Sequence, residues 1–301
     1  MKLPPNMQVF ERGWLSANNI LFLGRDETAL VDSAYATHSE QTLALVAHGL
    51  AGRGLDRLVN THLHSDHCGG NAALQARYRC HTTIPAADAA AVRDWNEDAL
   101  TYRATGQHCP RFSFDDTLAG GERLRLGDLD WNALAAPGHD PHSLVLYCPA
   151  EGLLISADAL WENGFGVIFP ELEGESGFLE TRATLDMIAQ LDVRGVIPGH
   201  GAPFTDVRGA LERAFRRIDF LAADPVRNAQ NGMRALVKFR LLECRQVPLA
   251  QLRQWMRDVP LFAEMNRRHL QMEEGELADW TVAQLVKAGV AALENGVLVD
   301  R

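Results

Sequence analysis

The sequence predicts an α+β protein built as a four-layer αββα sandwich, followed by a small, mainly helical C-terminal domain. Within the first 205 residues, short apolar runs typical of strands are followed by a helical pattern, and this succession occurs twice. From about residue 206 onward, apolar residues recur at helical spacing almost throughout. We therefore expect one domain over residues 1–215 and a second over residues 216–301.

The first half of the sandwich is predicted between residues 7 and 95. Residues 7–32 alternate as β-hairpins do, with turn residues between their apolar runs. A helix is expected after Thr37, a candidate N-cap with Glu40 three residues later, and it should stop near Gly52. The next elements are a strand and two helical stretches, at 55–59, 70–78 and 86–95.

The second half begins after residues 106–121, which are rich in Gly, Pro and Asp and indicate a surface loop. It contains four predicted strands, an amphipathic helix and a short buried strand, at 123–126, 129–136, 143–147, 153–156, 178–191 and 195–197. Two sheets packed face to face, with helices outside each, would bury both sets of strands.

The C-terminal part is predicted to be helical and to end in a hairpin around Glu294-Asn295-Gly296. An apolar stripe at helical spacing comes first, formed by Val207, Leu211, Phe215, Ile218 and Leu221. Further helices are expected near 226–244, 248–257, 260–270 and 277–288.

Charge and composition favour a small-molecule ligand over a polyanion. The net charge of the 301 residues is −10, and the 206–301 segment has 15 basic and 13 acidic residues, or +2. The first 205 residues therefore carry 14 − 26, or −12, which disfavours nucleic acid as the habitual ligand because phosphate contacts dominate such binding. Five scattered cysteines, an N-terminus without an apolar stretch and the absence of a membrane-length apolar run predict a cytoplasmic protein outside the membrane.

A loop rich in histidine follows the predicted strand at 55–59. His62 and His64 alternate along extended backbone and should project to the same side, whereas Asp66 and His67 follow the bend toward the next helix. Imidazole and carboxylate are the ligands that divalent transition metals favour when thiolate is absent. The loop therefore predicts two adjacent metal half-sites.

Three later loops also offer a ligand just beyond an apolar strand. His139 follows the strand that ends near Ala136, Asp158 follows 153–156, and His200 follows 195–197. Both of these histidines come directly after a glycine, which allows the tight turn that aims an imidazole inward.

The pattern His-x-His-x-Asp-His, with these three later positions, resembles the signature of the metallo-β-lactamase superfamily over roughly residues 15–205. The resemblance implies the αββα fold and seven metal ligands: His62, His64 and His139 at one metal, Asp66, His67 and His200 at the other, and Asp158 bridging both. The bridging aspartate resembles the hydroxyacylglutathione hydrolase (glyoxalase II) and lactonase branch. Histidine at position 64 favours two zinc ions over the di-iron centre of flavoprotein relatives, with iron or manganese as alternatives.

The implied activity is hydrolysis of a small thioester, ester or lactone by a bridging hydroxide. Asp66 is the candidate catalytic residue, because it could orient the hydroxide and accept its proton. Asp32, which ends its strand near the site, is a candidate acceptor for the N–H of a ligand imidazole. His142 is expected at the mouth of the pocket, acting on substrate without binding metal, and Trp161 and Phe165 are candidates for an apolar substrate wall.

Two other functions stay open at this point. The first is cleavage of single-stranded RNA, because the C-terminal part resembles the winged-helix-like domain of some relatives and contains Arg213, Arg216 and Arg217. An arginine stripe on a helix is more often a solvated face, however. The second is a mononuclear iron sulfur dioxygenase, which shares the fold. The sequence leaves the substrate, the oligomeric state and the role of the C-terminal domain open.

Overall fold

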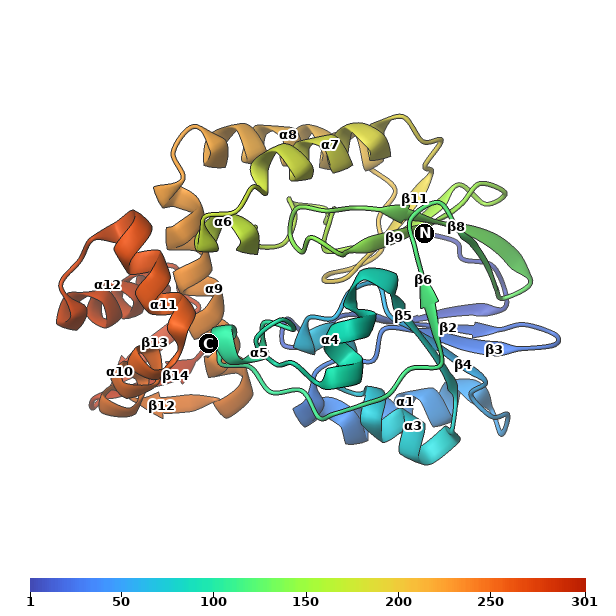
Figure 1. Cartoon of the computed structure of the whole chain (residues 1–301), viewed down its shortest axis with the longest axis horizontal. Coiled ribbons are helices and arrows are strands. Elements are labelled where there is room, and N and C mark those ends of the chain that lie inside the picture. Colours follow the sequence, from blue (N-terminus) through green and yellow to red (C-terminus); the bar gives the residue numbers. More distant parts are fainter.

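The computed structural model describes residues 1–301, except for the side chain of Glu274. Two mixed sheets face each other, and helices cover both outer faces (Figure 1). The first sheet has the order β1 (Met7–Phe10), β2 (Asn19–Leu23), β3 (Thr28–Val31), β4 (Arg57–Val59), β5 (His81–Pro85) and β6 (Asp116–Leu118). The second has the order β11 (Gly195–Pro198), β10 (Leu153–Ala157), β9 (Leu144–Cys148), β8 (Leu129–Ala135) and β7 (Arg123–Leu126).

Apolar side chains between the layers explain this arrangement. Phe22 and Val31 of the first sheet and Trp131 and Ile155 of the second belong to one buried cluster between the sheets. The rings of Phe22 and Trp131 meet edge to face, with centroids 5.6 Å apart. The αββα class predicted from the sequence is therefore confirmed.

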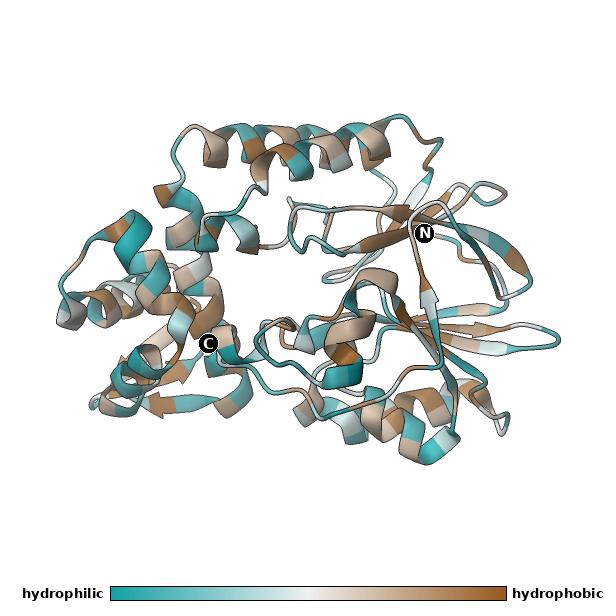
Figure 2. Cartoon of the chain, viewed as in Figure 1, coloured by the Kyte–Doolittle hydropathy of each residue, from teal (hydrophilic) through white to brown (hydrophobic). Residues whose placement is uncertain are grey.

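Helices close the sandwich on its two outer faces. α1 (Ser39–Leu50) and α3 (Asn71–Tyr78) lie under the first sheet, and α7 (Phe178–Ala189) and α8 (Val207–Ala222) lie over the second (Figure 1). Separate apolar clusters fill these outer interfaces. Figure 2 shows the resulting pattern, in which α7 and α8 alternate between hydrophilic and hydrophobic residues. Among the described residues, no helix is long and apolar enough to cross a membrane.

Three details differ from the sequence-based expectations. Thr37 is not an N-cap, because it lies inside the short 3-10 helix η1 (Ala36–His38), and α1 begins only at Ser39. The strand β5 was not predicted, and β6 lies inside the expected loop at 106–121. Both strands pair in parallel at one side of the first sheet, so long-range pairing outweighs their weak local patterns.

The C-terminal region has its own apolar core. It comprises α9 (Val226–Cys244), β12 (Gln246–Pro248), α10 (Leu249–Asp258), α11 (Pro260–Met265), η3 (Asn266–Leu270), α12 (Glu274–Lys287), β13 (Ala291–Glu294) and β14 (Val297–Asp300). The predicted terminal hairpin is present, and β12 adds to it in the order β12-β14-β13. We propose a winged-helix-like domain here, on the basis of this connectivity. A division at 215/216 also stays a proposal, and α8 passes through that point without interruption.

Candidate metal centre

The candidate site lies at one edge of the sandwich, where the carboxyl ends of strands from both sheets meet. β3 pairs with β4 in parallel, and β10 pairs with β11 in parallel, so within each pair the loops after the strands emerge together. Asp32 follows β3, the histidine-rich loop follows β4, Asp158 follows β10, and His200 follows β11. The strand pairing therefore gathers residues that are far apart in the sequence.

Backbone contacts hold these loops together across the two sheets. The backbone N–H of Asn18 donates to the Gly199 carbonyl at 2.7 Å. The side-chain amide of Asn18 donates to the carbonyls of Pro198 and Gly201 at 2.9 and 2.8 Å. The Leu144 N–H donates to the Thr61 carbonyl at 2.9 Å. The loops are thus fixed by the rigid ends of strands, which suits a site that requires precise geometry.

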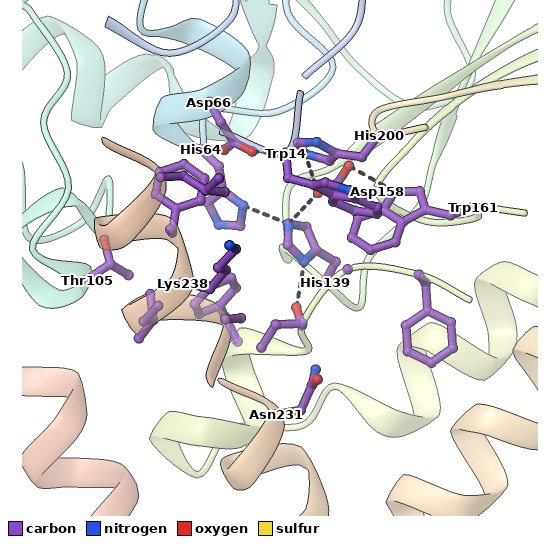
Figure 3. Close-up of a pocket in the computed structure, with 18 of the residues that line it drawn as sticks. Trp14, His64, Asp66, Thr105, His139, Asp158, Trp161, His200, Asn231 and Lys238 are labelled. Atoms are coloured by element: carbon purple, nitrogen blue, oxygen red, sulfur yellow. Dashed lines mark hydrogen bonds and ion pairs between the residues drawn. The ribbon is translucent and has the colours of Figure 1, made fainter. Parts of the chain in front are cut away.

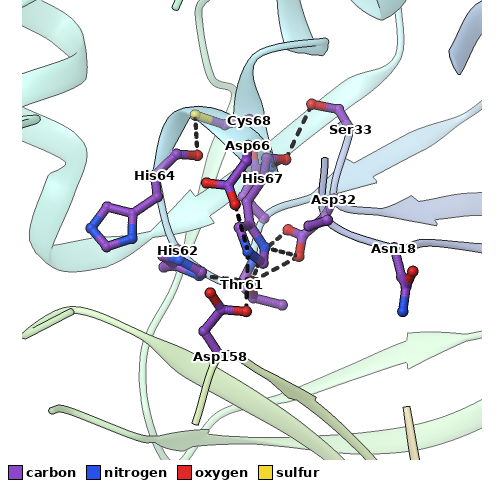
Figure 4. A network of polar contacts seen from close by, with 12 residues as sticks. Asn18, Asp32, Ser33, Thr61, His62, His64, Asp66, His67, Cys68 and Asp158 are labelled. Carbon is purple, nitrogen blue, oxygen red and sulfur yellow. Dashed lines mark hydrogen bonds and ion pairs between the residues drawn. The ribbon is translucent and has the colours of Figure 1, made fainter. Parts of the chain in front are cut away.

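All seven predicted ligands come together in two adjoining groups. Their ligand atoms lie within 4.8 Å of one another inside each group, which consist of His62, His64 and His139, and of Asp66, His67, Asp158 and His200. Every member is buried or nearly so, with at most 8% of its surface exposed. Figure 4 shows His62, His67 and Asp66, from the loop after β4, on the side of that loop where Asp158 lies.

Asp158 lies between the two groups. Its Oδ1 atom is 3.4 Å from Nε2 of His67, and its Oδ2 atom is 3.4 Å from Nε2 of His139. The residue before it, Ala157, has a φ of 45°, a conformation that L-residues other than glycine rarely adopt. A register shift in β10 accompanies this turn. The end of β10 is therefore bent in a way that aims the carboxylate into the site.

The hydrogen bonds outside the cluster determine which imidazole nitrogens face inward. Nδ1 of His67 is 2.8 Å from Asp32 Oδ2, and Nδ1 of His139 is 2.5 Å from the Val167 carbonyl. Because the carboxylate and the carbonyl accept, each Nδ1 carries a proton, and Nε2 is the atom of each ring that faces the centre. The geometry expected for Asp32, beside a ligand imidazole, is thus present.

The donor set fits divalent metal ions. Nε2 of His62 and Nε2 of His67 are buried without a hydrogen-bond partner among the described residues. Burial lowers the pKa of His62, and the neighbouring histidines lower it further, so this imidazole remains a neutral donor. Burial also opposes protonation of His67, but Asp158, Asp32 and Asp66 outweigh it and raise that pKa. Imidazole nitrogens beside buried carboxylates are the ligand chemistry of zinc and of similar transition metals, and a bound cation would replace the proton that these carboxylates favour on His67.

A cavity of about 420 Å³ opens onto this cluster, with His64, Asp66, His139, Asp158 and His200 in its wall. Trp161 and Phe165, the predicted wall residues, both line it. Phe165 also belongs to the apolar cluster between the second sheet and the helices α7 and α8, and it is only 1% exposed. The volume falls in the range of small-molecule sites.

Sequence reasoning missed several parts of this cavity, of which two carry the most weight. Trp14 stacks on the His200 ring, with centroids 5.4 Å apart and planes 8° from parallel, and it carried no recognisable signal in the sequence. The other part is the wall contributed by α9, which includes Leu236 and Phe239. Lys238 of this helix is labelled in Figure 3. Amphipathic spacing in α9 could not reveal which face would meet a loop of the other domain.

His142 does not line the cavity. Its Nδ1 atom lies 2.6 Å from Asp88 Oδ1, and its side chain is 42% exposed. The neighbouring Asp140 is closer to the cluster, with Oδ2 3.6 Å from His64 Nε2. Burial and Asp88 raise the pKa of Asp140 to about 6. The position expected for His142, at the mouth of the pocket, is therefore not the one observed.

An αββα sandwich with a buried His and Asp cluster at its strand ends defines a class of metal-binding proteins with a small-molecule cavity. The family model of the metallo-beta-lactamase superfamily matches residues 12–200. The chain belongs to the metallo-beta-lactamase superfamily.

Relatives and solved structures agree with this assignment. The hydroxyacylglutathione hydrolase of Thermosynechococcus vestitus is 28% identical over 163 residues, which cover 54% of this chain and 57% of the relative. That of Dechloromonas aromatica is 33% identical over 137 residues, covering 46% and 41%. The chain thus spans about half the length of the curated relatives it matches.

Two solved structures show the fold. A metallo-beta-lactamase family protein of Thermus thermophilus matches with a TM-score of 0.60 over 100% of both chains, at 19% identity. A protein crystallised in a di-iron-bound form matches with a TM-score of 0.56 over 69% of this chain and 98% of that chain, at 24% identity.

Proposed function

We propose that this chain is a dinuclear, zinc-dependent hydrolase of a small thioester, ester or lactone. The observation that carries the proposal is the pair of adjoining ligand groups joined by Asp158. In this proposal His62, His64 and His139 hold one metal, Asp66, His67 and His200 hold the other, and Asp158 contacts both. The names of the relatives, hydroxyacylglutathione hydrolases, support a thioester among the candidate substrates.

A pair of bound divalent metals supplies an activated water and a Lewis acid for a carbonyl oxygen. The chain supplies the rest of the chemistry. Asp66 lines the cavity, and its Oδ2 atom is 3.0 Å from His200 Nε2. It would orient the attacking water, accept its proton and transfer that proton to the leaving group. Trp14 and Trp161 flank His200 and would exclude bulk water from one side.

Single-stranded RNA is a weaker candidate substrate. The three arginines that suggested it do not form an open basic surface, because Arg213 is paired with Asp206 and donates to the Glu162 carbonyl, and Arg217 is half-buried against Phe165. The acidic charge of the first 205 residues also opposes a polyanion. An iron sulfur dioxygenase would use one metal and would leave the second ligand group without a role.

The test is a substrate panel assayed with the full chain at several salt concentrations. Thioester, ester and lactone hydrolysis should depend on added zinc, stop on chelation and vary little with salt. RNA cleavage, if it occurred, would decrease steeply with salt through counterion release. Efficient, salt-sensitive RNA cleavage beside no measurable acyl hydrolysis would overturn the proposal.

A further inference from the structure

Arg217 on α8 is a cation that lines the cavity without a carboxylate partner. Its Nε atom is buried and has no hydrogen-bond partner, and no ion pair joins it to any described residue. Arg213, four residues earlier on the same helix, is instead bound to Asp206 at 3.2 Å and to the Glu162 carbonyl at 2.7 Å. Arg217 is therefore distinct from Arg213, whose charge is paired, and from Arg216, which is exposed.

The loop between Trp161 and Val167 connects Arg217 to the metal centre. The guanidinium carbon of Arg217 lies 5.3 Å from the centre of the Phe165 ring. The two glycines that flank Phe165 pack closely against these neighbours. A Cβ atom added to Gly164 would lie 2.9 Å from Arg217 Cδ, and one added to Gly166 would lie 2.4 Å from His139 Nδ1. A single loop thus contacts both the arginine and a candidate ligand. The guanidinium therefore lies against the Phe165 ring and has an unused donor at Nε.

The electrostatic setting of Arg217 favours an anion. Burial and the nearby positive charge of Arg234 both lower the pKa of Arg217. Lys238, the other lysine or arginine in the described cavity wall, is already paired, because its Nζ donates to Asp300 and to the Val290 carbonyl. A partly desolvated cation without a partner is costly, and a ligand carboxylate would offset that cost.

We propose that Arg217 binds a carboxylate carried by the substrate, at a distance from the bond that is hydrolysed. The proposal rests on the proposed function and specifies its substrate class as an acyl compound with an apolar segment and one negatively charged end. Phe165, Val167, Phe169, Leu236 and Phe239 provide the apolar wall for that segment. One available cation matches one negative charge, and the planar guanidinium matches a planar carboxylate.

The test compares two thioesters of equal length, one with a terminal carboxylate and one with a terminal methyl group. The zinc-loaded wild type should prefer the carboxylate substrate in kcat/KM. Arg217→Met keeps the apolar stem and should reduce that preference by about 10- to 100-fold, the range for a charge-assisted hydrogen bond. Arg217→Lys should give an intermediate preference, because lysine keeps the positive charge but lacks the paired N–H donors of the planar guanidinium. Arg216→Met, at the exposed neighbouring position, is the matched control and should leave the preference unchanged.

A binding measurement separates this proposal from the hydrolase proposal. Calorimetry with the zinc-loaded protein would compare α,ω-dicarboxylates with monocarboxylates of the same length. The dicarboxylates should bind more tightly at one optimal length, and Arg217→Met should remove that advantage. If the calorimetry gives this result but no hydrolysis is detected, the proposal of a carboxylate site stands and the proposal of a hydrolase is rejected. The carboxylate site would be overturned if folded, metal-loaded Arg217→Met showed the same preference for the carboxylate thioester over the methyl thioester as the wild type.

Discussion

Asp32 should control metal affinity through His67 and Thr61, although it does not line the cavity. Its Oδ2 atom accepts from His67 Nδ1 and from Thr61 Oγ1, both at 2.8 Å, and its Oδ1 atom accepts from the Thr61 N–H at 2.9 Å. Asp32→Asn keeps the volume but replaces one accepting oxygen with a donating amide. Asparagine also tolerates the left-handed φ of 58° at this position, so the substitution adds little backbone strain.

We expect Asp32→Asn to weaken metal binding about 10- to 100-fold, the usual effect of losing such an outer partner. This change equals about 1.4–2.8 kcal/mol. The metal-free protein should also lose about 1.5–3 kcal/mol of unfolding free energy, the value of one charge-assisted hydrogen bond. Competition with a chromophoric chelator measures the first quantity, and denaturant unfolding measures the second.

Asp56→Asn provides the matched control. The Asp56 carboxylate accepts from the N–H and the hydroxyl of Thr28 at 2.8 and 2.9 Å, at the opposite end of β3. This variant should lose some stability and keep the metal affinity of the wild type. A folded Asp32→Asn protein that binds metal as tightly as Asp56→Asn would refute the role assigned to Asp32.

Three further predictions concern the site. Gly199→Ala should reduce metal affinity at least tenfold in a chelator competition, because the new Cβ atom would lie 2.2 Å from Asp158 Oδ1. Gly54→Ala is the control and should leave metal affinity unchanged, because its Cβ atom would have no neighbour within 4 Å. Asp158→Ala should lose about one of two bound metals in elemental analysis, and full retention of both would contradict its bridging position. His142→Ala breaks a contact with Asp88 outside the cavity, so it should keep both metals and change kcat/KM by no more than about twofold, as surface substitutions do. A large loss of turnover with intact metal content would instead show that His142 acts on the substrate.

The ligand loops were predictable because each places its chemistry within a few residues of a strand. His62, His64 and His67 are close in the sequence, and Gly-His at 138–139 and 199–200 combines a turn with a ligand. The layered fold was predictable for a similar reason, since most strands are continuous apolar runs. β5 escaped detection because it contains two threonines and ends in a proline, so its pattern resembles a loop.

The substrate wall could not be predicted, because it depends on how α9 meets the sandwich. Arg217 lies in a run of arginines that is typical of a solvated helix face, and only the tertiary structure separates it from Arg213 and Arg216. His142 shows the opposite case. Its position three residues after His139 suggested the cavity, but the turn directs its side chain to Asp88.

Metal content in relation to activity tests the central claim most directly. The purified 301-residue chain would be stripped with a chelator, reloaded with zinc in steps, and assayed for hydrolysis of a thioester and a lactone. Hydrolysis should be absent from the stripped protein and reach its maximum at two zinc ions per chain, as the two ligand groups require. Full activity with a single bound iron, or none at any zinc loading, would contradict a dinuclear hydrolase.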